Sequence, residues 1–213
     1  MDPIKSIRKK QQERAGSQAA TQPPEHHPEM LYIGCIDARL DPIDDIGIGK
    51  GKALIFRNPA ALVLPHRPDK DATPRNLGVG ASLEFFLTRF PHESGKVRHV
   101  VVSGHTDCGG LKACQHGKFG KDDYYLPIYM ESLQVVRDNV MAKAKKEGWD
   151  DAKILQELEK GSVRQSIANL LTYPMVAQAM KEGKLQIHGW VIDTATQRIS
   201  EMDNNTLEFH PMG

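Results

Sequence analysis

The sequence is poor in cysteine, in long apolar runs and in excess charge of either sign. Three cysteines in 213 residues are too few for a secreted disulfide framework, so we expect reduced thiols and a cytoplasmic location. A formal net charge of +1 gives no support for binding nucleic acid or a membrane surface. No apolar run approaches the roughly 20 residues of a membrane-spanning helix, and the basic first residues lack the apolar core of a secretory signal.

The length suits one sizeable domain. We predict an N-terminal arm over residues 1–29 and a single α/β domain over residues 30–213. Within the arm, KSIRKKQQERAG predicts a short helix that ends at Gly16, and SQAATQPPEHHPE predicts an extended linker. Arms of this kind pack on a neighbouring subunit or fray at the terminus, and the sequence leaves both possibilities open.

Apolar runs alternate with segments of helical periodicity along the domain. The runs predict strands over residues 30–37, 52–58, 97–104 and 184–193, with a further strand over 198–203 paired as a hairpin. Helical spacing covers residues 75–90, 126–146 and 150–182, with interruptions expected near Gly148, Gly161 and Pro174. Alternating strands and helices predict an α/β fold with a mainly parallel sheet.

Two of the three cysteines lie where predicted strands end. Cys35 ends the first apolar run, and His105 and Cys108 lie in GHTDCGG after the third run. Ligands of parallel sheets bind beyond the carboxyl ends of the strands. Two thiolates and one imidazole suit Zn²⁺, and three protein ligands leave the open position of a catalytic site. The alternative is that these are inert buried cysteines, as we expect for Cys114.

Asp37 and Arg39 follow Cys35 at alternate positions. If the backbone stays extended there, all three side chains project to one face. The carboxylate could then reach the metal or its water, and the arginine could hold that carboxylate in a bidentate pair. The alternative is a surface ion pair that contributes little to stability.

The pattern C-x-D-x-R, followed about seventy residues later by H-x-x-C-G-G, resembles that of the β-class carbonic anhydrases. The resemblance covers roughly residues 28–203, and further motifs occur in the order that the family uses. These are CIDARLDP, FRNPAALV, GVGASLEFFL, GHTDCGG, SVRQSIANLL and IHGWVIDTATQRI.

The resemblance implies a Rossmann-like α/β fold of four parallel strands and a fifth antiparallel strand, flanked by helices. Cys35, His105 and Cys108 would hold Zn²⁺, and Asp37 and Arg39 would form the catalytic dyad. The implied reaction is reversible hydration of carbon dioxide to bicarbonate and a proton, by attack of a zinc-bound hydroxide. The resemblance also implies a homodimer or a higher oligomer built from dimers, with active sites at the subunit interface.

Several positions depart from the family pattern. His26 stands where many members have a substrate-binding glutamine, Phe85 replaces the usual tyrosine, and Ala61 ends the motif that usually closes with asparagine. Some members hold an inhibitory bicarbonate with a tryptophan and an arginine; here Tyr32 and Arg57 occupy those positions. These changes bear on substrate choice more than on reaction type.

Two thiolates cancel the charge of a zinc ion, so its water is expected to be less acidic than under three histidines. Asp37 would then orient the nucleophile, and Arg39 would keep Asp37 off the metal. Loss of that pair would let Asp37 close the site, which predicts an inactive state favoured at lower pH. The alternatives are hydrolysis of carbon disulfide or carbonyl sulfide at the same site, and a non-catalytic, zinc-stabilised binding protein.

Overall fold

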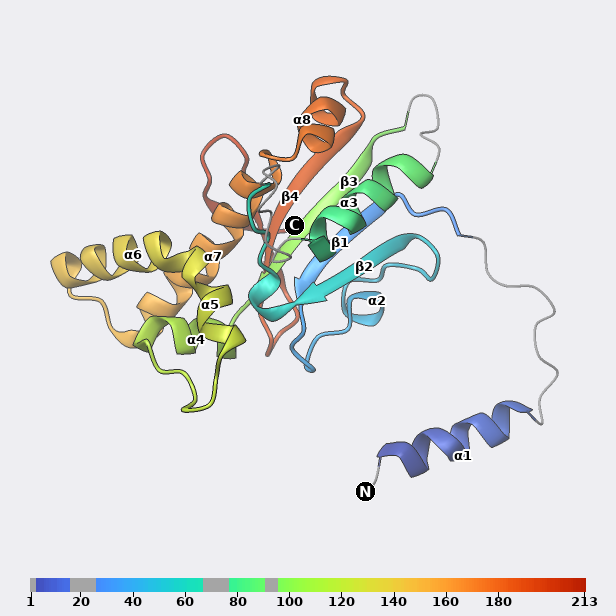
Figure 1. The fold of residues 1–213 in the computed structure, drawn as a ribbon, viewed down its shortest axis with the longest axis horizontal. Coiled ribbons are helices and arrows are strands. Elements are labelled where there is room, and N and C mark those ends of the chain that lie inside the picture. The colour runs from blue at the N-terminus through green and yellow to red at the C-terminus, as the bar shows by residue number, and fades with distance from the viewer. Residues whose placement is uncertain (1–2, 16–25, 67–76, 91–95) are drawn as a thin grey trace.

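A six-stranded sheet forms the centre of the molecule (Figure 1). The computed structural model describes residues 3–15, 26–66, 77–90 and 96–213. The strands lie in the order β2-β1-β3-β4-β5-β6, of which the first four are parallel and the last two antiparallel. Their bounds are β1 Met30–Cys35, β2 Ala53–Asn58, β3 Arg98–His105, β4 Leu185–Ile192, β5 Ile199–Met202 and β6 Phe209–Pro211. The predicted four parallel strands and antiparallel fifth strand are confirmed, and β6 is an addition that the sequence did not predict.

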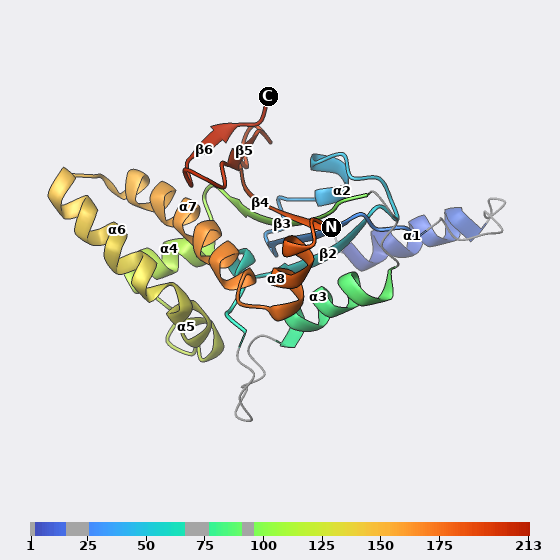
Figure 2. The same cartoon turned by 90° about the horizontal axis from the view of Figure 1, so that it is seen from above.

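Helices follow most of the parallel strands. They are α1 Pro3–Ala15, α2 Pro42–Asp45, α3 Leu77–Arg89, α4 Gly109–His116, α5 Tyr125–Met130, α6 Gln134–Glu147, α7 Asp151–Leu170 and α8 Pro174–Lys181, with 3-10 turns η1 Pro59–Ala61 and η3 Glu131–Leu133. Helices α3, α7 and α8 cover one face of the sheet (Figure 2). Helices α4 and α5 lie beyond the carboxyl ends of the strands, where they enclose the candidate site.

The two inner strands of the parallel part, β1 and β3, are buried on both faces. Alternate residues of β1 and β3, such as Leu31 and Val100, join the core formed with α3, α7 and α8. The intervening Tyr32 and Val101 pack on the opposite face with Trp190. Burial on both faces explains why these strands read as continuous apolar runs in the sequence.

The expected interruption at Gly161 is wrong, because α7 runs without a break from Asp151 to Leu170. A Cβ on Gly161 would lie 2.6 Å from Cγ1 of Val136, so this glycine allows α6 and α7 to approach closely. The breaks expected at the other two positions are present: Gly148 ends α6 with a φ of 69°, and α8 begins at Pro174.

The predicted N-terminal helix is present as α1. Most of the predicted linker, residues 17–25, lies outside the described residues, and the division into arm and domain stays a prediction. Among the helices described here, none is both long enough and apolar enough to cross a membrane.

Candidate metal centre

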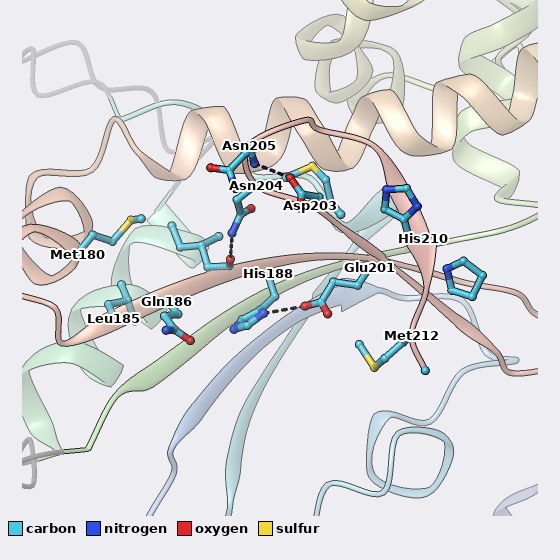
Figure 3. Close-up of a pocket in the computed structure, with 14 residues that line it drawn as sticks. Met180, Leu185, Gln186, His188, Glu201, Asp203, Asn204, Asn205, His210 and Met212 are labelled. Atoms are coloured by element: carbon cyan, nitrogen blue, oxygen red, sulfur yellow. Dashed lines mark hydrogen bonds and ion pairs between the residues drawn. The ribbon is translucent and has the colours of Figure 1, made fainter.

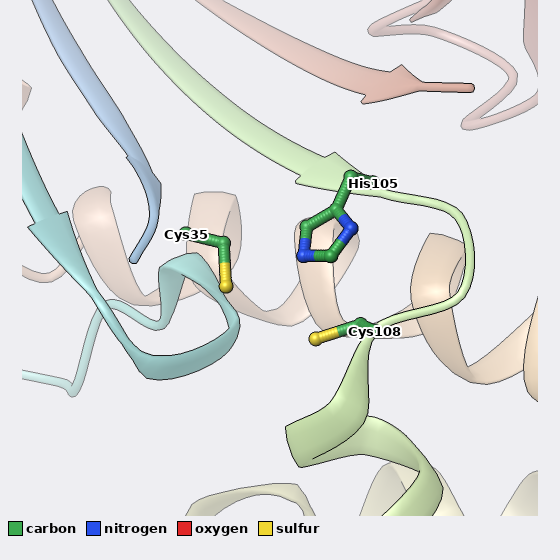
Figure 4. A group of neighbouring side chains, drawn as sticks. All are labelled: Cys35, His105 and Cys108. Atoms are coloured by element: carbon green, nitrogen blue, oxygen red, sulfur yellow. The ribbon is translucent and has the colours of Figure 1, made fainter. Parts of the chain in front are cut away.

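The structure brings Cys35, His105 and Cys108 together at the carboxyl end of the sheet (Figure 4). Cys35 is the last residue of β1 and His105 the last of the neighbouring strand β3, while Cys108 caps the N-terminus of α4. Their candidate ligand atoms all lie within 4.8 Å of one another. All three residues are buried, with 6% or less of each exposed.

The chemistry of this cluster fits a metal ion. His105 Nδ1 donates to the carbonyl oxygen of Thr106 at 2.9 Å, so in the neutral imidazole Nε2 is the unprotonated nitrogen. Nε2 is buried and has no hydrogen-bond partner among the described residues. Buried polar atoms rarely stay unpaired, and an imidazole held by its other nitrogen is the usual form of a metal-binding histidine. Two sulfurs beside it make the donor set typical of zinc.

The two cysteine thiols lie close enough to affect each other's ionisation. The proximity of Cys108 lowers the pKa of the Cys35 thiol, against the opposing effect of burial and with help from His105. The same proximity, together with burial, raises the pKa of Cys108. One thiolate is thus available at neutral pH, and a bound cation would release the proton of the second.

Asp37 lies beside this cluster, with its Oδ2 3.8 Å from His105 Nε2. Arg39 donates from Nε to Asp37 Oδ1 at 2.9 Å and from Nη2 to Oδ2 at 2.7 Å, forming a bidentate pair. These bonds hold the pKa of Asp37 well below its usual range. The carboxylate next to the candidate metal position is therefore charged.

The strand predicted to reach residue 37 ends at Cys35, and the backbone does not stay extended beyond it. The amide of Leu40 donates to the carbonyl of Asp37 at 3.2 Å, and the Arg39 amide donates to Asp37 Oδ1 at 2.9 Å. The Asp37 side chain stabilises this turn by accepting the backbone amide two residues on. The turn still brings Arg39 to Asp37, although not through strand alternation.

Arg57 supports the same turn from β2. Its Nε donates to the carbonyl of Cys35 at 2.7 Å and its Nη2 to the carbonyl of Asp37 at 2.6 Å. The sequence had suggested Arg57 only as a bicarbonate ligand with Tyr32, which is 1% exposed here. Its contacts fix the backbone that carries the first cysteine and the carboxylate, and the bicarbonate role stays a prediction.

Sequence reasoning missed two further carboxylates. Asp107, between two candidate ligands, accepts from Arg39 Nη1 at 2.9 Å, and its place in H-T-D-C was a signal that could have found it. Glu159 of α7 is 3% exposed and accepts the Cys108 amide at 3.4 Å. Burial raises the pKa of Glu159 to about 7. The sequence around Glu159 gives no sign that this residue is buried beside the site, because it lies in a helix with many charged residues.

The departures from the family pattern lie in different places. The rings of His26 and Phe85 each pack edge-on against Phe90, with centroids 5.0 and 5.4 Å away. Ala61 is fully buried beside the site, with a φ of 54°. Their effect on substrate choice stays a prediction.

A hollow of about 720 Å³ lies between β4 and the β5–β6 hairpin (Figure 3). It is lined by His188 and Glu201, which are joined at 2.8 Å, and by residues at the start of β4. The candidate metal centre lies beyond the other ends of the parallel strands. The hollow therefore belongs to a separate part of the molecule.

Residues 30–199, well over half of the chain, match the protein-family model described as carbonic anhydrase. The chain is 29% identical over 183 residues to the carbonic anhydrase of Synechococcus elongatus, an alignment that covers 85% of this chain and 62% of that protein. It is 28% identical over 198 residues to carbonic anhydrase 1 of Escherichia coli O157:H7, covering 92% and 81%. The chain thus spans less than two thirds of the cyanobacterial relative.

The fold is also similar to that of solved β-carbonic anhydrases. A tetrameric β-carbonic anhydrase from the filamentous ascomycete Sordaria macrospora superposes with a TM-score of 0.74 at 24% identity, covering 94% of this chain and 97% of that one. At this identity the likeness speaks for the fold alone. The family match, a β carbonic anhydrase of Arabidopsis thaliana that is 32% identical over 168 residues, covering 76% of this chain and 59% of that protein, and the shared fold lead to one conclusion. The chain belongs to the carbonic anhydrase family, in its β class.

Proposed function

We propose that this chain catalyses the reversible hydration of carbon dioxide to bicarbonate and a proton, with Zn²⁺ held by Cys35, His105 and Cys108. The observation that carries the proposal is a buried cluster of two thiols and an unpartnered ring nitrogen, with a charged carboxylate 3.8 Å from that nitrogen. Family membership supports the reaction type. The donor set supports zinc over harder cations, which prefer oxygen ligands.

The residues around the centre have separate roles in this proposal. A bound zinc ion supplies Lewis acidity that lowers the pKa of water toward 7. Asp37 accepts a hydrogen bond from the attacking water and so orients its lone pair toward carbon dioxide. Arg39 engages both oxygens of Asp37, which keeps the carboxylate charged and away from the metal position. We expect weaker activity at low pH, where loss of this pair would let Asp37 close the site.

The direct test is carbon dioxide hydration by zinc-loaded protein, by metal-stripped protein and by Asp37→Asn. We expect stripping to abolish turnover and readdition of Zn²⁺ to restore it. Asp37→Asn should lower kcat by about 100-fold at unchanged zinc content. Asp193→Asn is the matched control, because Asp193 follows another parallel strand, β4, and accepts a hydrogen bond from the Thr196 amide in its own turn. Full turnover without metal, or in Asp37→Asn, would refute this mechanism. No turnover by the zinc-loaded parent protein would instead favour a non-catalytic, zinc-stabilised protein.

A second candidate reaction uses the same site. Carbon disulfide and carbonyl sulfide are linear like carbon dioxide, and the changed positions His26, Phe85 and Ala61 are those that the resemblance assigns to substrate contacts or their surroundings. Release of hydrogen sulfide from either compound, measured beside carbon dioxide hydration, separates the two. A larger kcat/KM for a sulfur substrate would reassign the physiological reaction.

We also propose a homodimer, or a higher oligomer built from dimers. Strand β2 is an edge of the sheet, and beside it an apolar hollow of about 400 Å³ is lined by residues of β1, β2 and α3 that include Ile55 and Phe85. Phe85 is 49% exposed, and an exposed apolar patch at an unpaired edge suits a second copy. Sedimentation should show a dimer or tetramer that Phe85→Glu dissociates, whereas Val135→Glu on exposed α6 should not.

Cytoplasmic location remains part of the proposal. Cys35, Cys108 and Cys114 are all free thiols in the structure, which suits a reducing compartment. Fractionation of the native host, with an antibody to this chain, would test the location directly.

A further inference from the structure

Arg39 is held by two carboxylates from two different loops. From the loop after β1, Asp37 accepts Arg39 Nε and Nη2. Asp107 lies in the loop after β3. Its Oδ2 accepts a hydrogen bond from Arg39 Nη1 at 2.9 Å, and its backbone carbonyl accepts one from Arg39 Nη2 at 3.1 Å. The guanidinium therefore joins the loop that carries Asp37 to the loop that lies between His105 and Cys108.

The backbone at Asp107 is shaped for this contact. Its φ is 64°, in the left-handed region that aspartate and asparagine tolerate better than most residues. The other carboxylate oxygen, Oδ1, pairs with Lys112 in the first turns of α4. The hydrogen bond from Lys112, followed by that from Arg39, lowers the pKa of Asp107 below its usual range.

We propose that Asp107 is a positioning residue, which fixes the Arg39 guanidinium and through it the orientation of the Asp37 carboxylate at the metal centre. The proposal rests on the proposed function for its effect on turnover. Its structural content, an arginine immobilised by a second carboxylate, does not depend on that function.

The geometry explains why a second anchor is needed. The Arg39 side chain is 46% exposed, whereas that of Asp37 is 17% exposed. An exposed ion pair alone contributes only a few tenths of a kcal/mol to about 1 kcal/mol, too little to hold a long side chain in one position. A guanidinium bound on two sides to different loops loses that freedom, so Asp37 keeps one orientation.

The test is Asp107→Asn, which keeps the size, the left-handed preference and the backbone carbonyl contact but removes the charge. Lys112→Met and Asp193→Asn are the controls: the first leaves both Arg39 contacts in place, and the second removes a negative charge elsewhere at this edge of the sheet. Rotation about the Arg39 Cζ–Nε bond is measured by NMR on zinc-loaded protein without substrate. Turnover, zinc content and melting temperature are measured on the same samples.

We expect Asp107→Asn to speed that rotation and to lower kcat, each by about threefold to fivefold, with KM and zinc content unchanged. A loss in kcat alone is the result for an interaction that acts on the transition state. Both controls should stay within twofold of the parent. Unchanged rotation in Asp107→Asn overturns the proposal, whether or not kcat falls. Faster rotation in a protein whose parent form does not hydrate carbon dioxide would support the anchor and refute the proposed function.

Discussion

Gly104 allows α7 to approach the sheet immediately before His105. A Cβ at this position would lie 2.8 Å from Cγ2 of Val163 on α7, and non-bonded carbons attract best at about 3.5–4.0 Å. Val163 is β-branched and has one strongly preferred rotamer in a helix, so it cannot simply turn aside. Gly104→Ala therefore requires α7 and β3 to separate by roughly 1 Å.

We expect Gly104→Ala to lower the free energy of unfolding by about 1–3 kcal/mol, the usual cost of overpacking a core. Urea unfolding of the zinc-loaded protein measures it. Because the displaced strand carries His105, affinity for zinc should also fall, by about tenfold, in competition with a chelator. A mutation that costs less than about 0.5 kcal/mol would show that the helix is not in close contact with the strand.

The matched control is Val163→Ala, which removes the opposing methyl groups. Val163→Ala alone should lower the free energy of unfolding by about 2 kcal/mol, because it leaves a cavity. Combined with Gly104→Ala, the two changes should fit together, with a coupling of at least about 1 kcal/mol toward stability. If the loss of unfolding free energy in the double variant equals the sum of the two single losses within about 0.3 kcal/mol, the reasoning is refuted, because Gly104→Ala would then not strain the contact with Val163.

Three other changes test interactions around the site. Burial raises the pKa of Glu159 to about 7 from an ordinary 4.5, so between these values the folded protein keeps a proton that the unfolded chain releases, and stability falls as pH rises. Glu159→Gln should remove about 2.5 kcal/mol of that fall between pH 5 and 8.5, measured from urea midpoints. Buried Arg98 donates to the Phe86 carbonyl at 2.8 Å near the end of α3; Arg98→Met should cost about 2–3 kcal/mol, seen as a lower melting temperature. Arg57→Met leaves the Cys35 carbonyl without its 2.7 Å donor and should speed zinc loss to a chelator by about tenfold.

The meeting of Cys35 with the His105 turn follows from sequence reasoning about parallel strands. Both residues end apolar runs, and the carboxyl ends of parallel strands lie along one edge. What periodicity cannot supply is which strands are neighbours. The order β2-β1-β3-β4 places the two ligand-bearing strands side by side, and only the resemblance to a known family implied that arrangement.

Other features depend on contacts between residues far apart in the chain. Gly161 read as a helix break, because nothing local shows that Val136 of another helix packs against it. Strand β6 has only three residues, which is too short to show an alternating apolar pattern. One of them is Pro211, a residue that disfavours a strand. The position of Asp107 between two candidate ligands is visible in the sequence, but its contact with Arg39, a residue 68 positions away, is not.

The charged groups beside the metal centre alternate in sign from the ligands toward solvent: Asp37, Arg39, Asp107 and Lys112. Each neutralises the next, so the series carries little net charge, and the member nearest the metal position, Asp37, dominates the local field. Removal of the outermost Lys112 is screened by solvent and leaves the inner pairs intact. Removal of the Asp107 charge frees one side of Arg39, the residue that sets the direction of Asp37. The loss of activity should therefore increase along the series toward the metal position, with Lys112→Met weakest, Asp107→Asn intermediate and Asp37→Asn strongest. A larger loss in Lys112→Met than in Asp107→Asn would refute this account of how the charges act.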